Sequence, residues 1–517
     1  MAKTFRPYTL DQQLLLPPDL RAWVPEGHLA LYVSDVVDAL DLSAILSVYA
    51  AADPRGGVPS HPAMLVKLLV YASCTGMPSS RRIERTTYED VPMRVLAGDQ
   101  HPDHDTIAAF RQQPLTARSG LFVQVLQLCE RAGLVKLGHV ALDGTKVQAN
   151  ASKHKAMSSG RMTETEQRLE AEVTALLAQA TARDASEDQQ YGVGRRGDEL
   201  PAKLAAELAR RESRLVKIRE AKVALEAEAR ERAKAAAVEA RAKLVERERP
   251  SEETGKRPGG RPPVVPHPES AVPEARAQRN FTDPESRILR DGATKSFVQA
   301  SNAQAVVDSH AQVIVATGVT QAATDVPQLV PMLTQVHANT GHWPTVASAD
   351  AGDYSEANMT AAALAAVDLY IPPDKHSHGR SAASLTAVVP APTGDDASSN
   401  DHDSLPPAAP APAAPAAVQG ASPAQAEVSV APAAEIAARL PSERKRMRAK
   451  MRTVEGQALY KMRKTIVEPM CGQTKERRGF RRFALRGLSK VQAEWDLICL
   501  THNVLKLFRA GGCLKPA

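Results

Sequence analysis

A long run of helix-forming residues interrupts the middle of this chain and limits what the remainder can fold into. Residues 163–248 are rich in Ala, Glu, Arg and Leu, and a Gly-Val-Gly turn at residues 192–194 divides them into a shorter and a longer arm. A heptad spacing is followed by Leu208, Leu215, Ile218, Leu225 and Ala229. We therefore predict an inserted, coiled-coil-like helical hairpin. Dimerisation through this seam and simple projection into solvent both stay open.

A second interruption is the Pro-, Ala- and Ser-rich tract of residues 373–440, which is too polar and proline-rich to pack. We predict a disordered linker there. Aromatic residues make up 4% of the chain against 43% hydrophobic residues, so much of the apolar content is alanine in helices and linkers. The folded parts are therefore expected in residues 1–130, 134–161, 279–372 and 441–517, with residues 162–278 forming the hairpin and a linker.

Residues 1–130 are predicted to form an all-helical N-terminal domain. Residues 61–73 are apolar and carry a proline suited to a first helical turn, and residues 79–90 begin with capping serines. Short helices of this kind form either a helix-turn-helix or a plain packed domain. We assign DNA binding to this domain. Its candidate contacts are Arg81, Arg82 and Arg85.

The residues around Asp143 predict a carboxylate at a strand end. Residues 140–142 are typical of a buried strand, and the Asp143-Gly144 pair that follows is expected to end it in a tight turn. Taken alone, an Asp before Gly is more often an ordinary turn residue than a site residue. The hypothesis of a metal-binding carboxylate therefore depends on further acids along the chain.

A second acid follows another predicted strand. Between residues 279 and 372 the pattern indicates strands at 302–308, 313–319, 345–349 and 368–371, with helices at 326–336 and 355–366. Asp350 follows the third of these strands, and Asp353 is a rival only three residues away. With the two interruptions removed, the order is strand, strand, strand, helix, strand, helix, strand, helix. This order predicts a mixed α/β core of the ribonuclease-H-like type.

A third acid is expected on the last helix of that order. Glu468 is that acid, and it belongs to a row of residues along the chain that comprises Tyr460, Arg463 or Lys464, Glu468 and Lys475. Lys464 and Glu468 are four residues apart and share one helix face. Pro469 disfavours helical geometry at Glu468, so we expect the helix to kink or end there and to aim the carboxylate outward.

The chain resembles the bacterial insertion-sequence transposases of the DDE type that carry a Tyr-Arg-Glu-Lys signature around the last acid. The resemblance rests on PDHDTIAAFR near the N-terminus, ALDGTKVQANASKHK and SADAGDYSEAN around the first two acids, and VEP..GQ.K...GF.RF.LRGL.KV..EW.L...HN..KL at the end. It covers nearly the whole chain. The gap between Arg463 and Glu468 is one residue longer than the signature usually has, which leaves Lys464 as an alternative cation.

The resemblance implies a DNA transposase with Asp143, Asp350 and Glu468 as catalytic residues and metal ligands. Two Mg²⁺ ions, with Mn²⁺ as a substitute, stabilise charge on both the attacking and the leaving oxygen of a phosphodiester. Water would free a 3′-hydroxyl at the element end, and that hydroxyl would attack target DNA. Tyr460, Arg463 or Lys464, and Lys475 would contact the DNA. The implied partners are terminal inverted repeats and target duplexes, bound by a homodimer or larger assembly.

The C-terminal part is the expected polyanion-binding surface. Residues 444–517 contain 19 Lys and Arg against 5 Asp and Glu, whereas the rest of the chain is acidic overall. Four arginines interleave with Phe480 and Phe483, a spacing suited to phosphate contacts over an apolar anchor. They are Arg477, Arg478, Arg481 and Arg482. The alternatives are a solvated basic tail and an amphipathic helix whose phenylalanines simply belong to the core.

The remaining features concern compartment and rival functions. Five cysteines without CxxC spacing argue against a disulfide framework or a zinc site. We expect no secretory signal and no membrane span, hence a bacterial cytoplasmic protein that is nucleoid-associated when bound to DNA. The rival hypotheses are an inactive DNA-binding remnant, a structural protein organised by the hairpin, and a hydrolytic nuclease without strand transfer.

Overall fold

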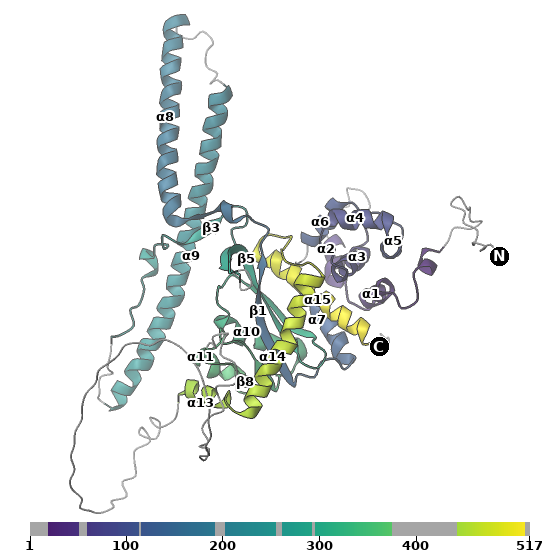
Figure 1. Cartoon of the computed structure of the whole chain (residues 1–517). Helices are drawn as coiled ribbons and strands as arrows, with labels where there is room; N and C mark the ends of the chain where they lie inside the picture. Colours follow the sequence, from purple (N-terminus) through teal and green to yellow (C-terminus); the bar gives the residue numbers. More distant parts are fainter. Residues whose placement is uncertain are drawn as a thin grey trace, which may run out of the picture.

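The structure is a computed structural model that describes residues 19–50, 59–112, 115–191, 202–254, 261–291, 295–374 and 442–511 (Figure 1). The predicted Gly-Val-Gly turn and, from residue 375, the predicted Pro/Ala-rich linker lie outside these ranges. Within them the chain combines a helical N-terminal region, a mixed sheet and a long helical hairpin that projects away from the sheet (Figure 1).

The sheet has six strands. They are β1 (His139–Gln148), β4 (Arg287–Arg290), β5 (Phe297–Asp308), β6 (Ile314–Thr320), β7 (Val346–Ser348) and β8 (Asp368–Tyr370). β1 lies between β5, which is antiparallel to it, and β7, which is parallel to it. The other edge of β5 pairs with both β4 and β6, and β8 runs parallel to β7. The sheet is therefore antiparallel on one side of β1 and parallel on the other.

Four helices cover the sheet or join it to the N-terminal region. They are α7 (Leu115–Arg131), α10 (Leu329–Thr340), α14 (Val454–Gly472) and α15 (Leu488–Arg509). α10 and α15 pack against β6, α14 packs against β1, and α15 also contacts α3 and α7. One apolar cluster extends from Ala30 in α1 through Leu142 in β1 to Leu507 in α15. The N-terminal helices and the sheet thus share one hydrophobic core.

The N-terminal region is helical, as predicted. Its elements are η1 (Leu20–Trp23), α1 (Leu29–Asp38), α2 (Ser43–Ala50), α3 (Pro62–Cys74), α4 (Ser80–Glu89), α5 (Val91–Ala97) and α6 (His104–Gln112). Pro62 begins α3, and the hydroxyl of Ser79 caps α4 by accepting from the Arg82 amide. Within the described parts of the chain, none of the helices combines the length and apolar character needed to cross a bilayer.

The hairpin consists of α8 (Ser159–Tyr191) and α9 (Ala202–Thr254), so the two predicted helical arms are confirmed. Leu215, Ile218 and Leu225 of α9 pack against Met162 and Leu169 of α8. The predicted seam is therefore used within the chain. At the foot of the hairpin, β2 (Ala156–Ser158) pairs with β3 (Gln278–Asn280), which closes the insertion.

Two sets of secondary-structure elements differ from the sequence prediction outside the candidate site. The strands β2, β3 and β4 were not expected, because they are short and lack a clear alternation of apolar residues. The predicted helix at residues 355–366 is wrong, since α11 (Glu356–Met359) and η5 (Ala362–Leu364) are separated by an extended Ala361. The Asn358 amide donates to the carbonyls of Val326 and Asp353 at 2.8 and 2.9 Å. These contacts to η4 (Val326–Gln328) and to the turn after β7 compete with the helix propensity of the alanines.

Candidate active site

The sheet brings the first two predicted acids together. Asp143 lies within β1, opposite Ala305 of β5. On the other edge of β1, the parallel pairing with β7 extends to Ala141 and Ser348. Two residues further along both segments, the same register places Asp143 level with Asp350. The two carboxylates therefore neighbour each other where β7 ends.

Gly144 does not form the predicted turn. β1 continues through Asp143 and Gly144 to Gln148, so the expectation that this pair ends the strand is wrong. A Cβ atom at Gly144 would collide with the side-chain amide of Gln304 and would lie 2.6 Å from Asp325 Oδ1. The glycine is thus explained by a close approach of buried polar side chains rather than by turn geometry.

The Asp143 carboxyl group is poised between charged neighbours. Burial raises the pKa of Asp143 to about 6, the nearby Arg463 opposes this rise, and repulsion from Asp350 and Asp325 adds to it. Arg463 Nη1 lies 3.8 Å from Asp143 Oδ1. A single guanidinium therefore faces a group of carboxylates that repel one another.

Asp350 and Asp353 have different surroundings. Asp350 is exposed, and its amide donates to Asp353 Oδ2 at 3.1 Å. Asp353 is 2% exposed, and its Oδ1 atom has no hydrogen-bond partner among the described residues. Burial, followed by repulsion from Asp325, Asp350 and Asp143, raises the pKa of Asp353 to about 7. Asp353 thus braces the turn after β7, while the Asp350 carboxylate is the accessible one.

Asp325 is a member of the site that sequence reasoning missed. Its Oδ1 atom accepts from the amides of Asn302 and Gln304 at 2.5 and 2.6 Å, and Lys146 Nζ lies 3.5 Å away. Asn302 and Gln304 are fully buried in β5. Two polar residues at alternate positions of an apolar strand are the available signal, because they lie on one face and need a buried partner.

α14 contributes the cation and an aromatic ring. The Arg463 guanidinium lies 5.8 Å from the centre of the Tyr460 ring and faces Asp143, whereas Lys464 is exposed. Repulsion from Asp350 contributes to the raised pKa of Tyr460, after burial and the opposing effect of Arg463. Of the two alternatives for the signature cation, the structure places Arg463 at the carboxylates.

Glu468 lies on the same helix, but α14 does not end there. The helix continues through Pro469 to Gly472, so of the two expected alternatives, a kink or an end at Glu468, the end is wrong. Glu468 is exposed, as expected of an outward-facing carboxylate. Its charge and that of Asp143 both raise the pKa of the Cys471 thiol, which burial raises to about 12. The charges of the first and the third predicted acid therefore both act on the Cys471 thiol.

The aspartates of the site offer the type of ligand atom that a divalent cation prefers. Asp143, Asp325, Asp350 and Asp353 repel one another, and Asp353 Oδ1 is buried without a hydrogen-bond partner among the described residues. Hard cations such as Mg²⁺ prefer oxygen ligands of this type. Within the described ranges, however, no three His, Cys, Asp or Glu side chains are grouped closely enough to hold a metal ion. Glu468 is therefore not gathered with the two aspartates.

The predicted DNA contacts divide into exposed and anchored residues. Arg81, Arg82, Arg85, Arg477, Arg481 and Arg482 are exposed. Lys475 is half-buried, and its ammonium donates to the Lys146 carbonyl at 2.8 Å, which fixes the turn after α14 (Gln473–Arg477) to β1. Phe480 and Phe483 are buried in the core, and their segment is not a helix.

Arg478 requires a correction, because its side chain is inside the fold. It is 5% exposed and donates to Thr501 Oγ1 at 2.7 Å, to the Ile498 carbonyl at 3.0 Å and to Thr474 Oγ1 at 3.3 Å. Burial lowers its pKa. The guanidinium ties the segment after α14 to α15 and is not available to a phosphate group.

Two family models match the chain. One is described as "Transposase domain (DUF772)" and matches residues 18–113, and the other as "Transposase DDE domain" and matches residues 427–508. The second match includes Tyr460, Arg463, Glu468 and Lys475, whereas Asp143 and Asp350 lie outside both. No curated protein and no solved structure matches the chain.

Proposed function

We propose, from the premise that this chain belongs to the insertion-sequence DDE transposases, that it cleaves DNA at the element ends and joins the freed 3′-hydroxyl to target DNA. The observation that carries the proposal is the register of β1 and β7, which sets Asp143 beside Asp350. The strand order β6-β5-β1-β7-β8, antiparallel and then parallel, supports a ribonuclease-H-like core.

The acids would act together as metal ligands. DDE transposases use a divalent metal, and two Mg²⁺ ions, or Mn²⁺ in their place, would stabilise the charge on the attacking and leaving oxygens. Asp143 and Asp350 would supply oxygen ligands from the sheet, and Glu468 would supply its carboxylate from α14. Because Glu468 is exposed, binding of DNA against α14 is the step expected to complete the set.

Neighbouring residues would orient the acids and the DNA. Arg463 faces the Asp143 carboxylate from one side, and its guanidinium has the charge and the fork of donors that suit a phosphate of the scissile strand. Lys475 fixes the turn after α14 to β1 through the Lys146 carbonyl. In cleavage, water forms a new P–O bond and the 3′-oxygen leaves. In strand transfer, that 3′-hydroxyl attacks a target phosphate and the target 3′-oxygen leaves, so each bond formed replaces one broken.

The proposed partners are the terminal inverted repeats and target duplex DNA, bound by a homodimer or larger assembly in the bacterial cytoplasm at the nucleoid. The exposed arginines of α4 and of residues 477–482 are the candidate DNA contacts outside the acids. Two rivals use the same fold. They are a DNA-binding remnant without activity and a hydrolytic nuclease without strand transfer.

The test is mobilisation of a selectable marker flanked by the native DNA of the gene. We expect the intact protein to mobilise the marker, and we expect Asp143→Asn and Glu468→Gln to abolish mobilisation while binding of the flanks is kept. Movement that is absent from the intact protein or indifferent to both substitutions, with the flanks still bound, would establish the remnant instead. Cleaved ends that never join to target DNA would indicate the hydrolytic nuclease.

A further inference from the structure

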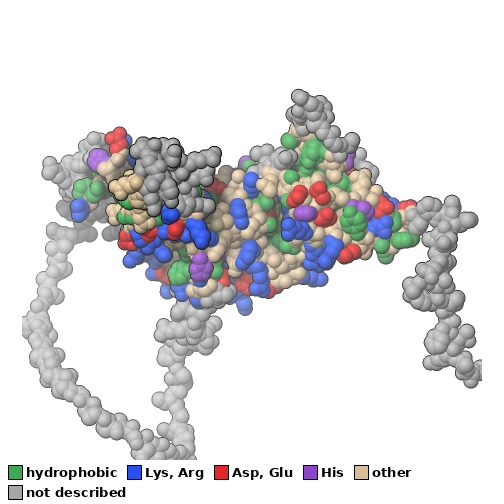
Figure 2. Space-filling model, turned by 90° about the horizontal axis from the view of Figure 1, so that it is seen from above, with side chains coloured by type: hydrophobic (Ala, Val, Ile, Leu, Met, Phe, Trp, Pro, Cys, Tyr) green, Lys and Arg blue, Asp and Glu red, His purple; other side chains and the backbone are tan. Residues whose placement is uncertain are grey.

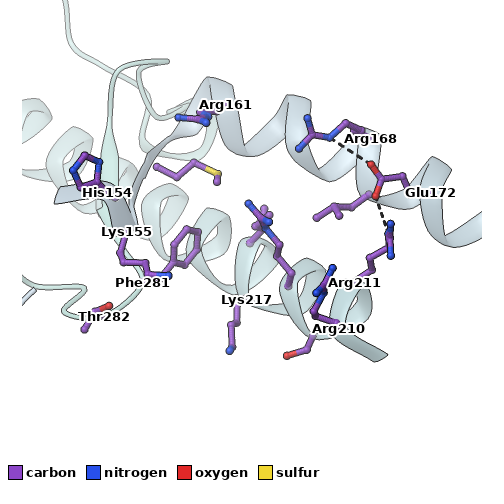
Figure 3. A pocket seen from close by; sticks show the side chains of 16 residues that line it. His154, Lys155, Arg161, Arg168, Glu172, Arg210, Arg211, Lys217, Phe281 and Thr282 are labelled. Atoms are coloured by element: carbon purple, nitrogen blue, oxygen red, sulfur yellow. Dashed lines mark hydrogen bonds and ion pairs between the residues drawn. The ribbon is translucent and has the colours of Figure 1, made fainter. Parts of the chain in front are cut away.

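The foot of the helical hairpin contains a strongly basic cavity that the active site does not use. This hairpin cavity, of about 740 Å³, lies between α8, α9 and the segments around β2 and β3 (Figure 3). Seven Lys and Arg side chains line it against one acid, Glu172. The space-filling view shows many Lys and Arg side chains around the hairpin and along the body of the molecule (Figure 2).

Only two of the seven cations are neutralised by that acid. Glu172 Oε2 accepts from Arg211 at 2.8 Å, and Glu172 Oε1 lies 3.7 Å from Arg168 (Figure 3). The other five form no ion pair with any residue that the structure describes. They are Lys155, Arg161, Arg210, Arg214 and Lys217. Five like charges around one hollow repel one another, and an anion in the hollow would relieve that repulsion.

Ion pairs outside the cavity join α9 to α8 and to the strands β3 and β4. Glu228 of α9 accepts from Arg279 at 2.7 Å and from Arg287 at 3.0 Å, and these two arginines belong to β3 and β4. Glu166 of α8 accepts from Arg219 and Lys222 of α9 at 3.0 and 2.6 Å. The helix that carries Arg210, Arg214 and Lys217 is therefore held in position relative to α8 and the sheet.

A second cavity continues the first toward the active site. This strand cavity, of about 570 Å³, shares His154, Lys155 and Thr282 with the hairpin cavity. Arg482 and Arg486 extend its basic lining. The Arg482 guanidinium donates to the side chain of Gln148, the last residue of β1, at 3.1 Å. The two cavities thus form one basic track from the hairpin to the strand that carries Asp143.

We propose that this track binds the sugar-phosphate backbone of duplex DNA, so that the hairpin is a second DNA contact away from the carboxylates. The inference rests on the proposed function for its choice of DNA as the polyanion. A small anion would occupy one hollow, whereas cations spread over α9, the segment before β2 and residues 482–486 match a ligand with repeated phosphates. The hairpin would then set where the DNA lies relative to β1.

The test compares two triple variants of the full chain with the same change in charge. The track variant combines Arg210→Gln, Arg214→Gln and Lys217→Gln. The control variant, further along the same helix and outside both cavities, combines Arg230→Gln, Lys234→Gln and Arg241→Gln. All six side chains are exposed, so both proteins should fold, and far-UV circular dichroism checks this.

The dissociation constant for a duplex that carries the element end is measured at several salt concentrations. Removing one phosphate contact reduces the slope of log K against log salt by about 0.9, so the slope of the track variant should fall by about 2–3 and its affinity at low salt by at least about tenfold. The control should retain the slope of the unmodified protein. Equal slopes for the two variants would overturn the proposal that the track binds DNA.

The outcomes for the track and for the proposed function are separable. An unmodified protein that binds the duplex with the expected difference between the variants, but never cleaves it, would leave the track standing and remove the transposase proposal. If the unmodified protein cleaves and joins DNA while both triple variants bind the duplex with equal slopes, the transposase proposal stands and the proposed track is removed.

Discussion

The side-chain amide of Gln312 donates a hydrogen bond to the carbonyl oxygen of Thr465 at 2.8 Å. Thr465 lies four residues before Pro469, the proline inside α14. Proline has no amide hydrogen, so the Thr465 carbonyl lacks the donor that a helix would normally give it. Gln312 supplies a donor from the loop between β5 and β6. This contact helps to explain why α14 continues past Glu468 to Gly472.

We predict that Gln312→Ala destabilises the protein by about 0.5–1.5 kcal/mol, the usual contribution of one hydrogen bond. In a Pro469→Ala background the same change should cost less, because an alanine at that position has an amide hydrogen that can bind the Thr465 carbonyl. Gln312 also accepts from Lys506 at 2.8 Å, and the effect of removing that hydrogen bond cancels in the double-mutant cycle. Urea unfolding of the four proteins measures the coupling, and a coupling energy of zero would contradict the compensation.

Gly144→Ala should destabilise the core by about 1–3 kcal/mol, as other overpacking changes do. The added Cβ would displace the Gln304 amide or the Asp325 carboxylate, both of which are buried or half-buried and hydrogen-bonded to each other. Gly138→Ala is a suitable control, since its Cβ would meet no atom within 4 Å among the described residues. Thermal unfolding compares the two, and equal effects would argue against the close approach.

The sequence predicted the parts of the site that local pattern controls. The apolar run before Asp143 indicated a buried strand, and Val140, Ala141 and Leu142 are buried. The strand before Asp350 is also present as β7. The pairing of β1 with β7 is a long-range contact that no local pattern contains, so the distance between the two acids could be inferred only through the fold. Asp325, in a loop of ordinary composition, carried no signal of its own.

The errors came from local rules that tertiary contacts override. Asp-Gly favours a turn, but Gly144 remains in the strand because the residues beside it need space. Pro469 should end a helix, but a side chain from elsewhere satisfies the exposed carbonyl. Arg478 belongs to a run of surface-like arginines, and only the position of α15 shows that its guanidinium is buried among Thr474, Ile498 and Thr501.

The two alternatives for the signature cation should separate in a cleavage assay. Arg463→Gln removes the guanidinium beside Asp143 and should slow strand cleavage by about 10–100-fold, which corresponds to about 1.4–2.7 kcal/mol. Lys464→Gln removes an exposed charge and should change the rate by less than about threefold. The assay is single-turnover cleavage of a labelled element end. A larger effect of Lys464→Gln would transfer the role to Lys464.

Substitution of Arg478 should lower stability, whereas substitution of its neighbour Arg477 should weaken DNA binding. Arg478→Met removes the donor to the hydroxyl oxygens of Thr501 and Thr474 and one of the two side-chain donors to the Ile498 carbonyl, and should lower the free energy of unfolding by about 1–3 kcal/mol. Arg477→Met, with the same change in charge at an exposed position, should change it by less than about 0.5 kcal/mol but weaken binding to duplex DNA. Denaturant unfolding measures the stability of each variant, and a gel-shift titration measures its DNA binding. An Arg478→Met protein of unchanged stability but weakened DNA binding would contradict the structural role of the buried Arg478 guanidinium.

Buried His502 should make the protein less stable in acid. His502 is 1% exposed, and its Nε2 atom lies 2.9 Å from the Gln312 carbonyl. Burial lowers its pKa from 6.5 to about 3, with smaller repulsive contributions from Arg478, Lys506 and Arg509. The histidine therefore binds a proton below about pH 6.5 in the unfolded chain, but only below about pH 3 in the folded protein. The contribution of neutral His502 to the free energy of unfolding is complete above about pH 6.5 and falls by up to about 1.4 kcal/mol per pH unit below it.

His502→Gln keeps a donor for the Gln312 carbonyl but cannot titrate, so the free energies of unfolding of the two proteins should converge or cross between about pH 6.5 and about pH 4. Parallel curves over that range would show that His502 is not the group responsible.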